Sequence, residues 1–163
     1  MKNLNRFNDG LSGLLFQTAM IGSFAMLAII FLNVFARYLF DSPFYWAEEV
    51  AAVLMVLVSL FPAAELWKQG AHINFEIVQK TVAESTWTKL KILVGMVSLL
   101  FTGVLAWQGL KAAYLVWARD MKEPSLLGTP LWIPYSLLVL GVGALFLRIL
   151  SSLWTGIQGG KKE

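Results

Sequence analysis

The sequence lacks cysteine altogether and holds a single histidine among its 163 residues. The absence of cysteine excludes disulfide bonds, thiolate metal sites and cysteine nucleophiles. The one histidine, His72, cannot supply a pair of haem ligands or a zinc site of the HExxH type. We therefore expect no cofactor and no bound metal, and we expect that the chain is not an enzyme.

Charge is also scarce. Only 14% of the residues are charged and 58% are hydrophobic, and the mean hydropathy is +0.67. A soluble domain of this length needs a larger polar fraction to cover its surface, so the composition indicates a protein surrounded by membrane lipid. The net charge of +3 is too small, and the basic residues too dispersed, to favour a nucleic-acid partner.

Four apolar stretches are long enough to cross about 30 Å of hydrocarbon as helices. They predict an all-α membrane protein with helices over residues 12–38, 43–66, 88–117 and 131–154. The first stretch is too long for the apolar region of a signal peptide, so we interpret it as an uncleaved transmembrane helix. With no internal repeat or linker, the whole chain is expected to form one four-helix membrane domain over 1–163.

Prolines mark helix boundaries. Ser42-Pro43 and Thr129-Pro130 each combine an N-cap residue with a proline at the first helical position, which predicts the starts of the second and fourth helices. Pro62 removes a hydrogen bond inside the second helix and predicts a kink there.

The basic residues favour an orientation with both termini in the cytoplasm. The cytoplasmic side then receives Lys2, Arg6, Lys68, Lys80, Lys89, Lys91, Arg148, Lys161 and Lys162, and the outer side receives Arg37, Lys111, Arg119 and Lys122. Between the second and third helices, apolar residues recur at roughly helical spacing at Ile73, Ile77, Val78 and Val82. This spacing predicts a short amphipathic helix at the cytoplasmic surface.

Charged residues interrupt the apolar pattern at the first outer loop. Glu48 and Glu49 fall near the start of the second helix, where the helix dipole favours carboxylates, and Arg37 ends the first helix. Adjacent helix positions point about 100° apart, so only one glutamate can face Arg37. We predict Glu49, with Tyr45 and Trp46 shielding an interfacial ion pair that fixes the hairpin. A proton or ion relay and a partner interface remain alternatives.

Polar groups deeper in the helices have simpler explanations. Lys111 and Arg148 lie near helix ends and are expected to reach the membrane boundary. Amides and hydroxyls in membrane helices usually bond to a neighbouring helix. These residues are Gln17, Asn33, Ser59, Thr102 and Gln108. We find neither a central carboxylate nor the interrupted helices typical of a transporter site, which predicts a subunit that transports nothing by itself.

Three stretches carry a family likeness: "NVFARYLFDSPFYWAEEVAAVLM", "HINFEIV" and "SLLGTPLWIPYSLLVLG". In this order they resemble the small, DctQ-like membrane subunit of tripartite ATP-independent periplasmic (TRAP) transporters. The matching positions are Arg37-Tyr38, Trp46, Glu48-Glu49, His72-Ile73, and Pro130 to Pro134 with Trp132 between them.

The resemblance implies a scaffold subunit in the bacterial inner membrane. It implies a stable heterodimer with a large elevator-type membrane subunit, and transient contact with a periplasmic substrate-binding protein that delivers an organic acid. Uptake would be driven by an ion gradient, usually sodium. Arg37, Trp46, Glu48, Glu49, His72, Pro130, Trp132 and Pro134 would have structural or interface roles.

The outer loops would face the binding protein. The candidate docking residues are Asp41, Arg119, Asp120, Lys122 and Glu123, and ordinary solvated loop charges are the simpler explanation of them.

Three other functions stay open. A stand-alone dimeric four-helix exporter would need a carboxylate in mid-membrane, and Glu48 and Glu49, the only candidates, are expected to be too shallow. A membrane anchor of a respiratory enzyme would need haem-ligating histidines. An unrelated assembly factor is the third.

Overall fold

A computed structural model describes residues 2–69, 84–125 and 127–159. Its helices are α1 (Lys2–Phe40), α2 (Ala47–Leu60), α3 (Ala63–Lys68), α5 (Glu84–Ala118) and α6 (Trp132–Gly159). Four segments are long and apolar enough to cross a membrane, namely Asn8–Phe40, Ala47–Lys68, Leu90–Ala118 and Trp132–Trp154. The predicted all-α class with four spans is therefore confirmed. The orientation stays a prediction, and the predicted amphipathic helix falls mostly in 70–83, outside the described residues.

The second span is bent at the predicted proline. α2 ends at Leu60 and α3 begins at Ala63, with Phe61 and Pro62 between them. Pro62 has no N–H to donate, so the helical hydrogen-bond pattern of α2 is interrupted there. A new helix begins directly after it, and the Pro62 carbonyl accepts bonds from the N–H groups of Glu65 (3.1 Å) and Leu66 (2.9 Å). The kink is confirmed.

The predicted start of the second helix is wrong. α2 begins at Ala47 rather than at Pro43, and Ser42 does not cap it. The reason is a side chain of α1, because the Oδ1 atom of Asn33 accepts a 2.7 Å bond from the N–H of Phe44 and holds residues 42–46 as a loop. This loop leaves Trp46 at the helix entrance.

The fourth span also starts slightly later than predicted, at Trp132. Lys122 and Pro130 form an antiparallel bridge, closed by a 3.0 Å bond from the Leu131 N–H to the Met121 carbonyl. Backbone hydrogen bonds therefore join the two arms of the loop between α5 and α6 before α6 begins.

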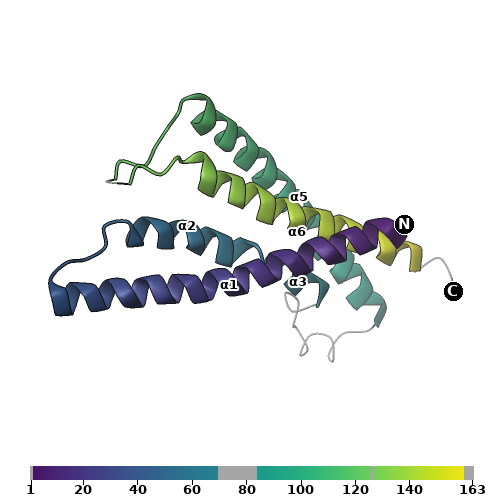
Figure 1. Cartoon of the computed structure of the whole chain (residues 1–163). Helices are drawn as coiled ribbons and strands as arrows, with labels where there is room; N and C mark the ends of the chain where they lie inside the picture. Colours follow the sequence, from purple (N-terminus) through teal and green to yellow (C-terminus); the bar gives the residue numbers. More distant parts are fainter. Residues whose placement is uncertain (1, 70–83, 126, 160–163) are drawn as a thin grey trace.

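The helices form two hairpins arranged as a V (Figure 1). One hairpin is α1 with α2 and α3, and the other is α5 with α6. They converge at the end that holds the two termini and diverge toward the connecting loops. We call these the terminal end and the loop end. α3 packs on α6 and α1, and a small core of Leu15, Ala19, Phe61, Ala64 and Ala144 fills the junction.

The hairpins approach most closely where α2 ends. A Cβ atom built on Gly141 of α6 would lie 2.7 Å from the Leu60 Cβ and 3.2 Å from the Leu60 carbonyl carbon and oxygen. Only glycine lets the two backbones cross at this distance. Elsewhere large apolar side chains point outward, such as Phe24 (75% exposed) and Leu100 (72%), as expected for surfaces in contact with lipid or another membrane protein.

Candidate functional site

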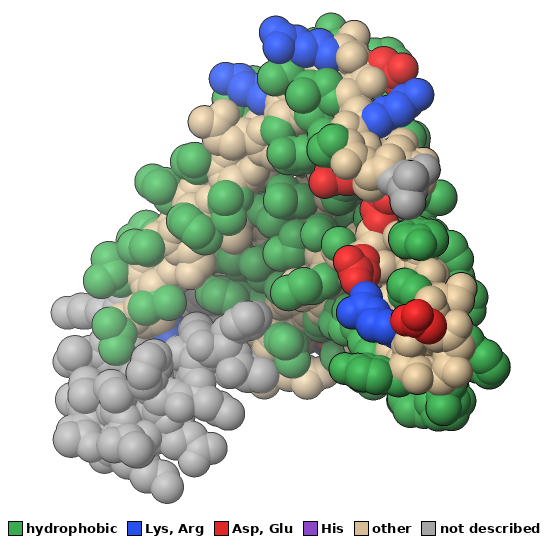
Figure 2. Space-filling model, turned by 90° about the vertical axis from the view of Figure 1, so that its left-hand side faces the viewer, with side chains coloured by type: hydrophobic (Ala, Val, Ile, Leu, Met, Phe, Trp, Pro, Cys, Tyr) green, Lys and Arg blue, Asp and Glu red, His purple; other side chains and the backbone are tan. Residues whose placement is uncertain are grey.

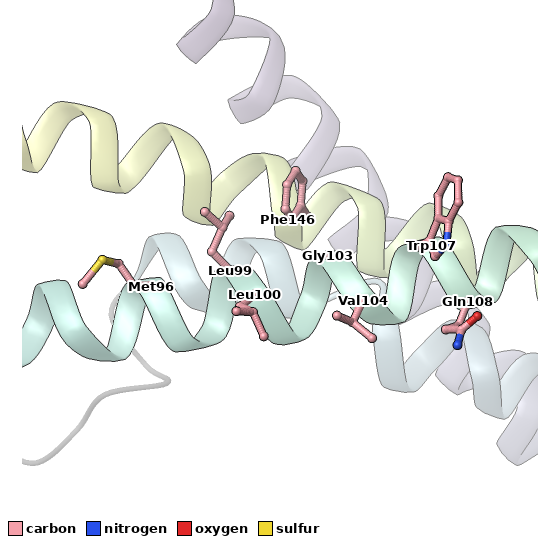
Figure 3. A pocket seen from close by; sticks show the side chains of 8 residues that line it. All are labelled: Met96, Leu99, Leu100, Gly103, Val104, Trp107, Gln108 and Phe146. Atoms are coloured by element: carbon pink, nitrogen blue, oxygen red, sulfur yellow. The ribbon is translucent and has the colours of Figure 1, made fainter.

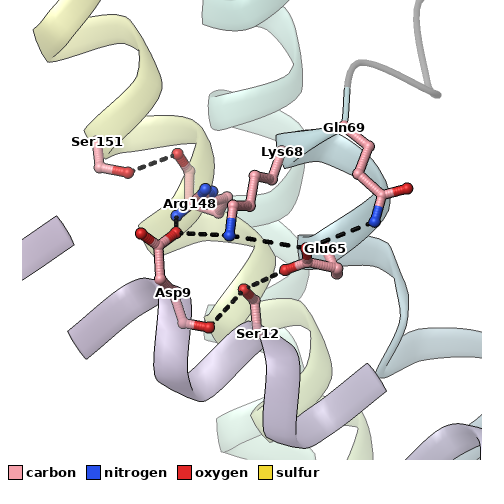
Figure 4. Close-up of polar contacts among 7 residues, drawn as sticks. All are labelled: Asp9, Ser12, Glu65, Lys68, Gln69, Arg148 and Ser151. Atoms are coloured by element: carbon pink, nitrogen blue, oxygen red, sulfur yellow. Dashed lines mark hydrogen bonds and ion pairs between the residues drawn. The ribbon is translucent and has the colours of Figure 1, made fainter. Parts of the chain in front are cut away.

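The polar side chains gather in two regions, one at each end of the V. At the terminal end five residues form a charge cluster, consisting of Asp9, Ser12, Glu65, Lys68 and Arg148 (Figure 4). At the loop end the charges lie on the loops, on the last turn of α1 and on the first turn of α2. Each region connects helices that are distant in the sequence.

Asp9 of α1 is the centre of the charge cluster. Its Oδ1 atom lies 2.9 Å from Nη1 of Arg148 on α6 and 3.0 Å from Nζ of Lys68 on α3. One carboxylate thus binds two cations from two different helices. Figure 4 shows these side chains converging between the three ribbons.

Glu65 completes the charge cluster. The hydroxyl of Ser12, which is buried, donates a 2.6 Å bond to Oε2 of Glu65. The other oxygen, Oε1, lies 3.7 Å from Nζ of Lys68 and accepts a 3.5 Å bond from Gln69. Two acids and two bases therefore compensate one another's charge across α1, α3 and α6.

The charge cluster lies at the terminal-end limits of the apolar spans, because Asp9 is the second residue of the first span and Lys68 is the last residue of the second. Arg148 precedes Trp154 by less than two turns, or about 9 Å along α6, and tryptophan prefers the membrane boundary. The side chains of Arg148 and Glu65 are only 13% and 14% exposed. Ionisable groups at such a place are stable only when paired, and this arrangement pairs them.

Sequence reasoning missed this cluster. It treated Arg148 as a residue that reaches the boundary, and it weighed only Glu48 and Glu49 as candidate carboxylates, whereas Glu65, near the end of the second span, belongs to the cluster. Glu65 is also far less exposed than Glu48, one of the two residues considered as candidates. The sequence did contain an indication of the cluster, because Asp9, Glu65, Lys68 and Arg148 all fall at the helix ends predicted to lie on the cytoplasmic side. The residues that pair are far apart along the chain, however, so the pairs could not be assigned.

At the loop end, the partner of Arg37 is Glu48, with 3.0 Å between Nη2 and Oε1. The prediction of Glu49 was therefore wrong, although the argument that only one glutamate can face Arg37 holds. The pair is exposed, at 51% and 76% of the two side chains, and Tyr45 does not shield it, being 74% exposed itself.

Glu49 has a different function, because it joins the two hairpins. Its Oε2 atom accepts a 2.6 Å bond from the Ser125 hydroxyl, and its Oε1 atom accepts a 2.7 Å bond from the Thr129 N–H. Both donors belong to the loop between α5 and α6. Figure 2, which faces the loop end, shows red acidic side chains spread from this loop down to the loop after α1.

An open groove of about 440 Å³ lies beside Glu49. Its apolar wall comes from α2 and the start of α6, and its rim carries Glu48, Glu49 and Glu123. Pro130 and Pro134 line the other side, whereas Trp132 points outward and is 43% exposed.

Two of the predicted docking residues end helices. Asp41 and Asp120 have positive φ angles of 50° and 45°, and they follow the last residues of α1 and α5 closely. Aspartate tolerates this left-handed conformation, which terminates a helix. Asp120 also pairs with Lys122 at 3.5 Å, while Arg119 lies exposed at the surface.

The remaining predicted residues are Trp46 and His72. Trp46 stands at the N-cap of α2 and packs against Phe44 with 5.8 Å between ring centroids. His72 lies outside the described residues. Within the described part of the chain, no three His, Asp or Glu side chains are grouped in a way that could hold a metal ion.

The family of the chain follows from a sequence model. The family described as the DctQ component of tripartite ATP-independent periplasmic transporters matches residues 26–159, which includes Glu48, Glu49 and all of α6 as far as Gly159. The chain belongs to this family. No curated protein matches the chain significantly.

Membership places the chain among multi-pass proteins of the bacterial inner membrane, as the four spans also indicate. It identifies the chain as the small membrane component of a TRAP transporter. It also implies association with a large membrane subunit and with a periplasmic binding protein. The matched range begins after Asp9 and Ser12, so the α1 half of the charge cluster lies outside it.

Proposed function

We propose that this DctQ-family chain is a rigid brace. It holds the large elevator-type subunit in place while an ion gradient, usually of sodium, drives uptake of an organic acid. The binding protein delivers the substrate and docks transiently, whereas the two membrane subunits form a stable heterodimer. Both termini lie in the cytoplasm, so the loop end faces the periplasm.

The observation that carries this proposal is the charge cluster. A transport site must release an ion or a proton during each cycle. In the charge cluster, each of the four charges is paired with a residue of another helix or of a neighbouring turn. The charged groups at this end of the spans therefore serve to hold α1, α3 and α6 together, which is what a brace requires.

The loop end supports the same function. Glu49 fastens the loop between α5 and α6 to α2, so the surface offered to the periplasm is fixed relative to both hairpins. Arg119, Lys122 and Glu123 lie exposed on that loop and offer charged contacts to a binding protein. Because Asp41 and Asp120 terminate helices, we assign them a structural contribution to this surface.

Reconstitution tests the proposal. Proteoliposomes that contain both membrane subunits should take up the substrate when a sodium gradient and the binding protein are supplied, and omission of the small subunit should abolish uptake. Liposomes that contain the small subunit alone should show no flux of substrate, sodium or protons. Gradient-driven flux through the small subunit alone would overturn the proposal and favour an exporter.

Glu65→Gln separates a brace from a proton relay. The amide keeps the shape of the side chain and can still accept the Ser12 hydrogen bond, but it cannot carry a proton. A brace should retain most of its uptake, in proportion to the amount of assembled complex. Loss of uptake with an unchanged amount of complex would contradict the brace.

A further inference from the structure

One long face of α5 is covered by no other described helix. The opposite side of α5 packs on α6, where a Cβ atom built on Gly109 would lie 2.7 Å from Leu138. On the uncovered side Val97 (62% exposed), Phe101 (61%) and Val104 (54%) recur at helical spacing. Either lipid or a partner helix must cover this face in the membrane.

A hydrogen-bonding group stands in the middle of this face. Gln108 lies one turn beyond Val104, is exposed, and points to the same side of α5 (Figure 3). Among the residues that the structure describes, none hydrogen-bonds with its amide. The exposed or half-exposed hydroxyls of Thr18, Ser23 and Ser59 differ, because each donates to a carbonyl of its own helix.

The depth of Gln108 makes an unpaired amide costly. Its neighbour Gly109 packs on Leu138, which lies less than two turns, or about 9 Å, inside Trp132. Hydrocarbon chains offer no hydrogen bond, so a polar group at this depth normally finds a partner in a neighbouring helix. The unpaired amide therefore favours a partner helix over lipid as the neighbour of this face of α5.

The surface beside Gln108 is shallow and open. A groove of about 560 Å³ runs along α5, lined by Met96, Leu99, Leu100, Gly103, Val104, Trp107 and Gln108 with Phe146 of α6. Its walls are almost entirely apolar, and Gln108 lies at one end of it (Figure 3). Lys111 is already engaged, with its ammonium group 5.1 Å from the centre of the Trp107 ring.

We infer that the groove on α5, with Gln108 at its end, binds a transmembrane helix of the large subunit. That helix would present a side chain or a free carbonyl that hydrogen-bonds with the Gln108 amide. This inference rests on the proposed function, because it assumes the large subunit as partner. It assigns this face of α5, with its groove, to the heterodimer interface.

The face of α1 provides a matched control. Gln17 is also exposed, and it shares its face of α1 with large apolar side chains such as Ile21 (69% exposed) and Phe24 (75%). Its amide, like that of Gln108, has no hydrogen-bond partner among the described residues, but it lines neither of the grooves described above, so the groove is what distinguishes the two faces. The same substitution at Gln108 and at Gln17 therefore compares the face of α5 with the face of α1 while the chemical change stays the same.

Site-specific photocrosslinking tests the assignment in the assembled transporter. The photoreactive residue p-benzoylphenylalanine replaces Leu100 or Val104 on α5, and Ile21 or Phe24 on α1. We expect adducts with the mass of the two membrane subunits from the α5 positions and few or none from the α1 positions. Adducts from α1 alone, adducts of two small subunits, or lipid adducts alone from α5 would each overturn the inference.

Substitution of the glutamines measures the hydrogen bond. Gln108→Leu should lower recovery of the large subunit with the small one by roughly three- to tenfold, the range for a hydrogen bond between membrane helices. Gln17→Leu should leave it unchanged. Both variants should melt like the parent when the small subunit is purified alone, and equal recovery for both would contradict the inference. If the wild-type subunits fail to co-purify, the proposed function itself fails.

Discussion

The two ends of the V use the same pair of charged groups in different surroundings. At the charge cluster, Arg148 and Asp9 lie 2.9 Å apart, and their side chains are 13% and 45% exposed, so the pair is half-buried. At the loop end, Arg37 and Glu48 lie 3.0 Å apart, but the arginine is 51% exposed. The distances are nearly equal, so burial decides how much each pair contributes.

The comparison shows where the fold depends on charge. Removing one partner of a buried pair costs about 3–5 kcal/mol, because the other charge is left without compensation. An exposed pair contributes about 0–1 kcal/mol. We therefore expect the terminal end to hold the hairpins together through its ion pairs, and the loop end to rely on the hydrogen bonds of Glu49.

The largest effect should follow from Arg148→Met. Asp9 would keep only Lys68 as a partner. Because the Asp9 side chain is itself 45% exposed, we expect a loss of about 2–3 kcal/mol in the free energy of unfolding, below the range for a fully buried pair and above that for an exposed one. Unfolding of the purified subunit in detergent by a denaturant measures it. Arg148→Lys, which retains the charge, should lose less. A cost no larger than that of Arg37→Ala would contradict the distinction between the two ends.

The charge cluster also shows how far sequence reasoning reaches. The four spans and the kink at Pro62 follow from apolar length and from the missing proline N–H, both of which are properties of a local segment. Asp9 and Arg148 are 139 positions apart. No periodicity within one helix indicates which faces of α1, α3 and α6 meet, so the contact could not be predicted.

The wrong partner for Arg37 has a related cause. Glu48 and Glu49 are adjacent, and helix geometry predicts that they point in different directions but not which one faces α1. The prediction of Glu49 depends on Tyr45 and Trp46 sharing its helix face, but α2 begins at Ala47, four residues later than predicted from Pro43, and leaves both aromatic residues outside the helix. That later start depends on the bond between Asn33 and the Phe44 N–H, which links two separate segments.

The crossing of α2 and α6 lies between the two ends and tests whether packing, rather than charge, joins the hairpins there. Gly141→Ala would place a methyl group 2.7 Å from the Leu60 Cβ, and overpacking of this kind costs about 1–3 kcal/mol. The thermal midpoint of the purified subunit should fall accordingly.

Gly143 is the matched control for this prediction, because a Cβ atom built there meets nothing within 4 Å. Gly143→Ala should be neutral, or stabilising by up to about 1 kcal/mol through its helix propensity. Equal destabilisation by the two alanines would show that the hairpins do not cross at Gly141.

Glu49→Ala tests the bond between the hairpins at the loop end. It leaves the Ser125 hydroxyl and the Thr129 N–H without their acceptor, so the loop between α5 and α6 loses its attachment to α2. Spin labels placed on the two loops should report a broader distribution of distances. Glu48→Ala, one residue away, should leave that distribution unchanged, and a similar broadening in both variants would contradict the separate roles of the two glutamates.

The smallest effect should come from Arg37→Ala, at about 0.2–1 kcal/mol, because both members of its pair are exposed to solvent.

The salt dependence of stability separates the Arg37 pair from the Arg148 pair more clearly. At about 1 M salt the screening length falls to about 3 Å, so an exposed pair should lose its contribution, while a buried pair is screened much less. We therefore expect the stability difference between wild type and Arg37→Ala to vanish in high salt and the difference for Arg148→Met to persist. If both differences fell in parallel as salt rose, the charge cluster would be as accessible to solvent as the loop end.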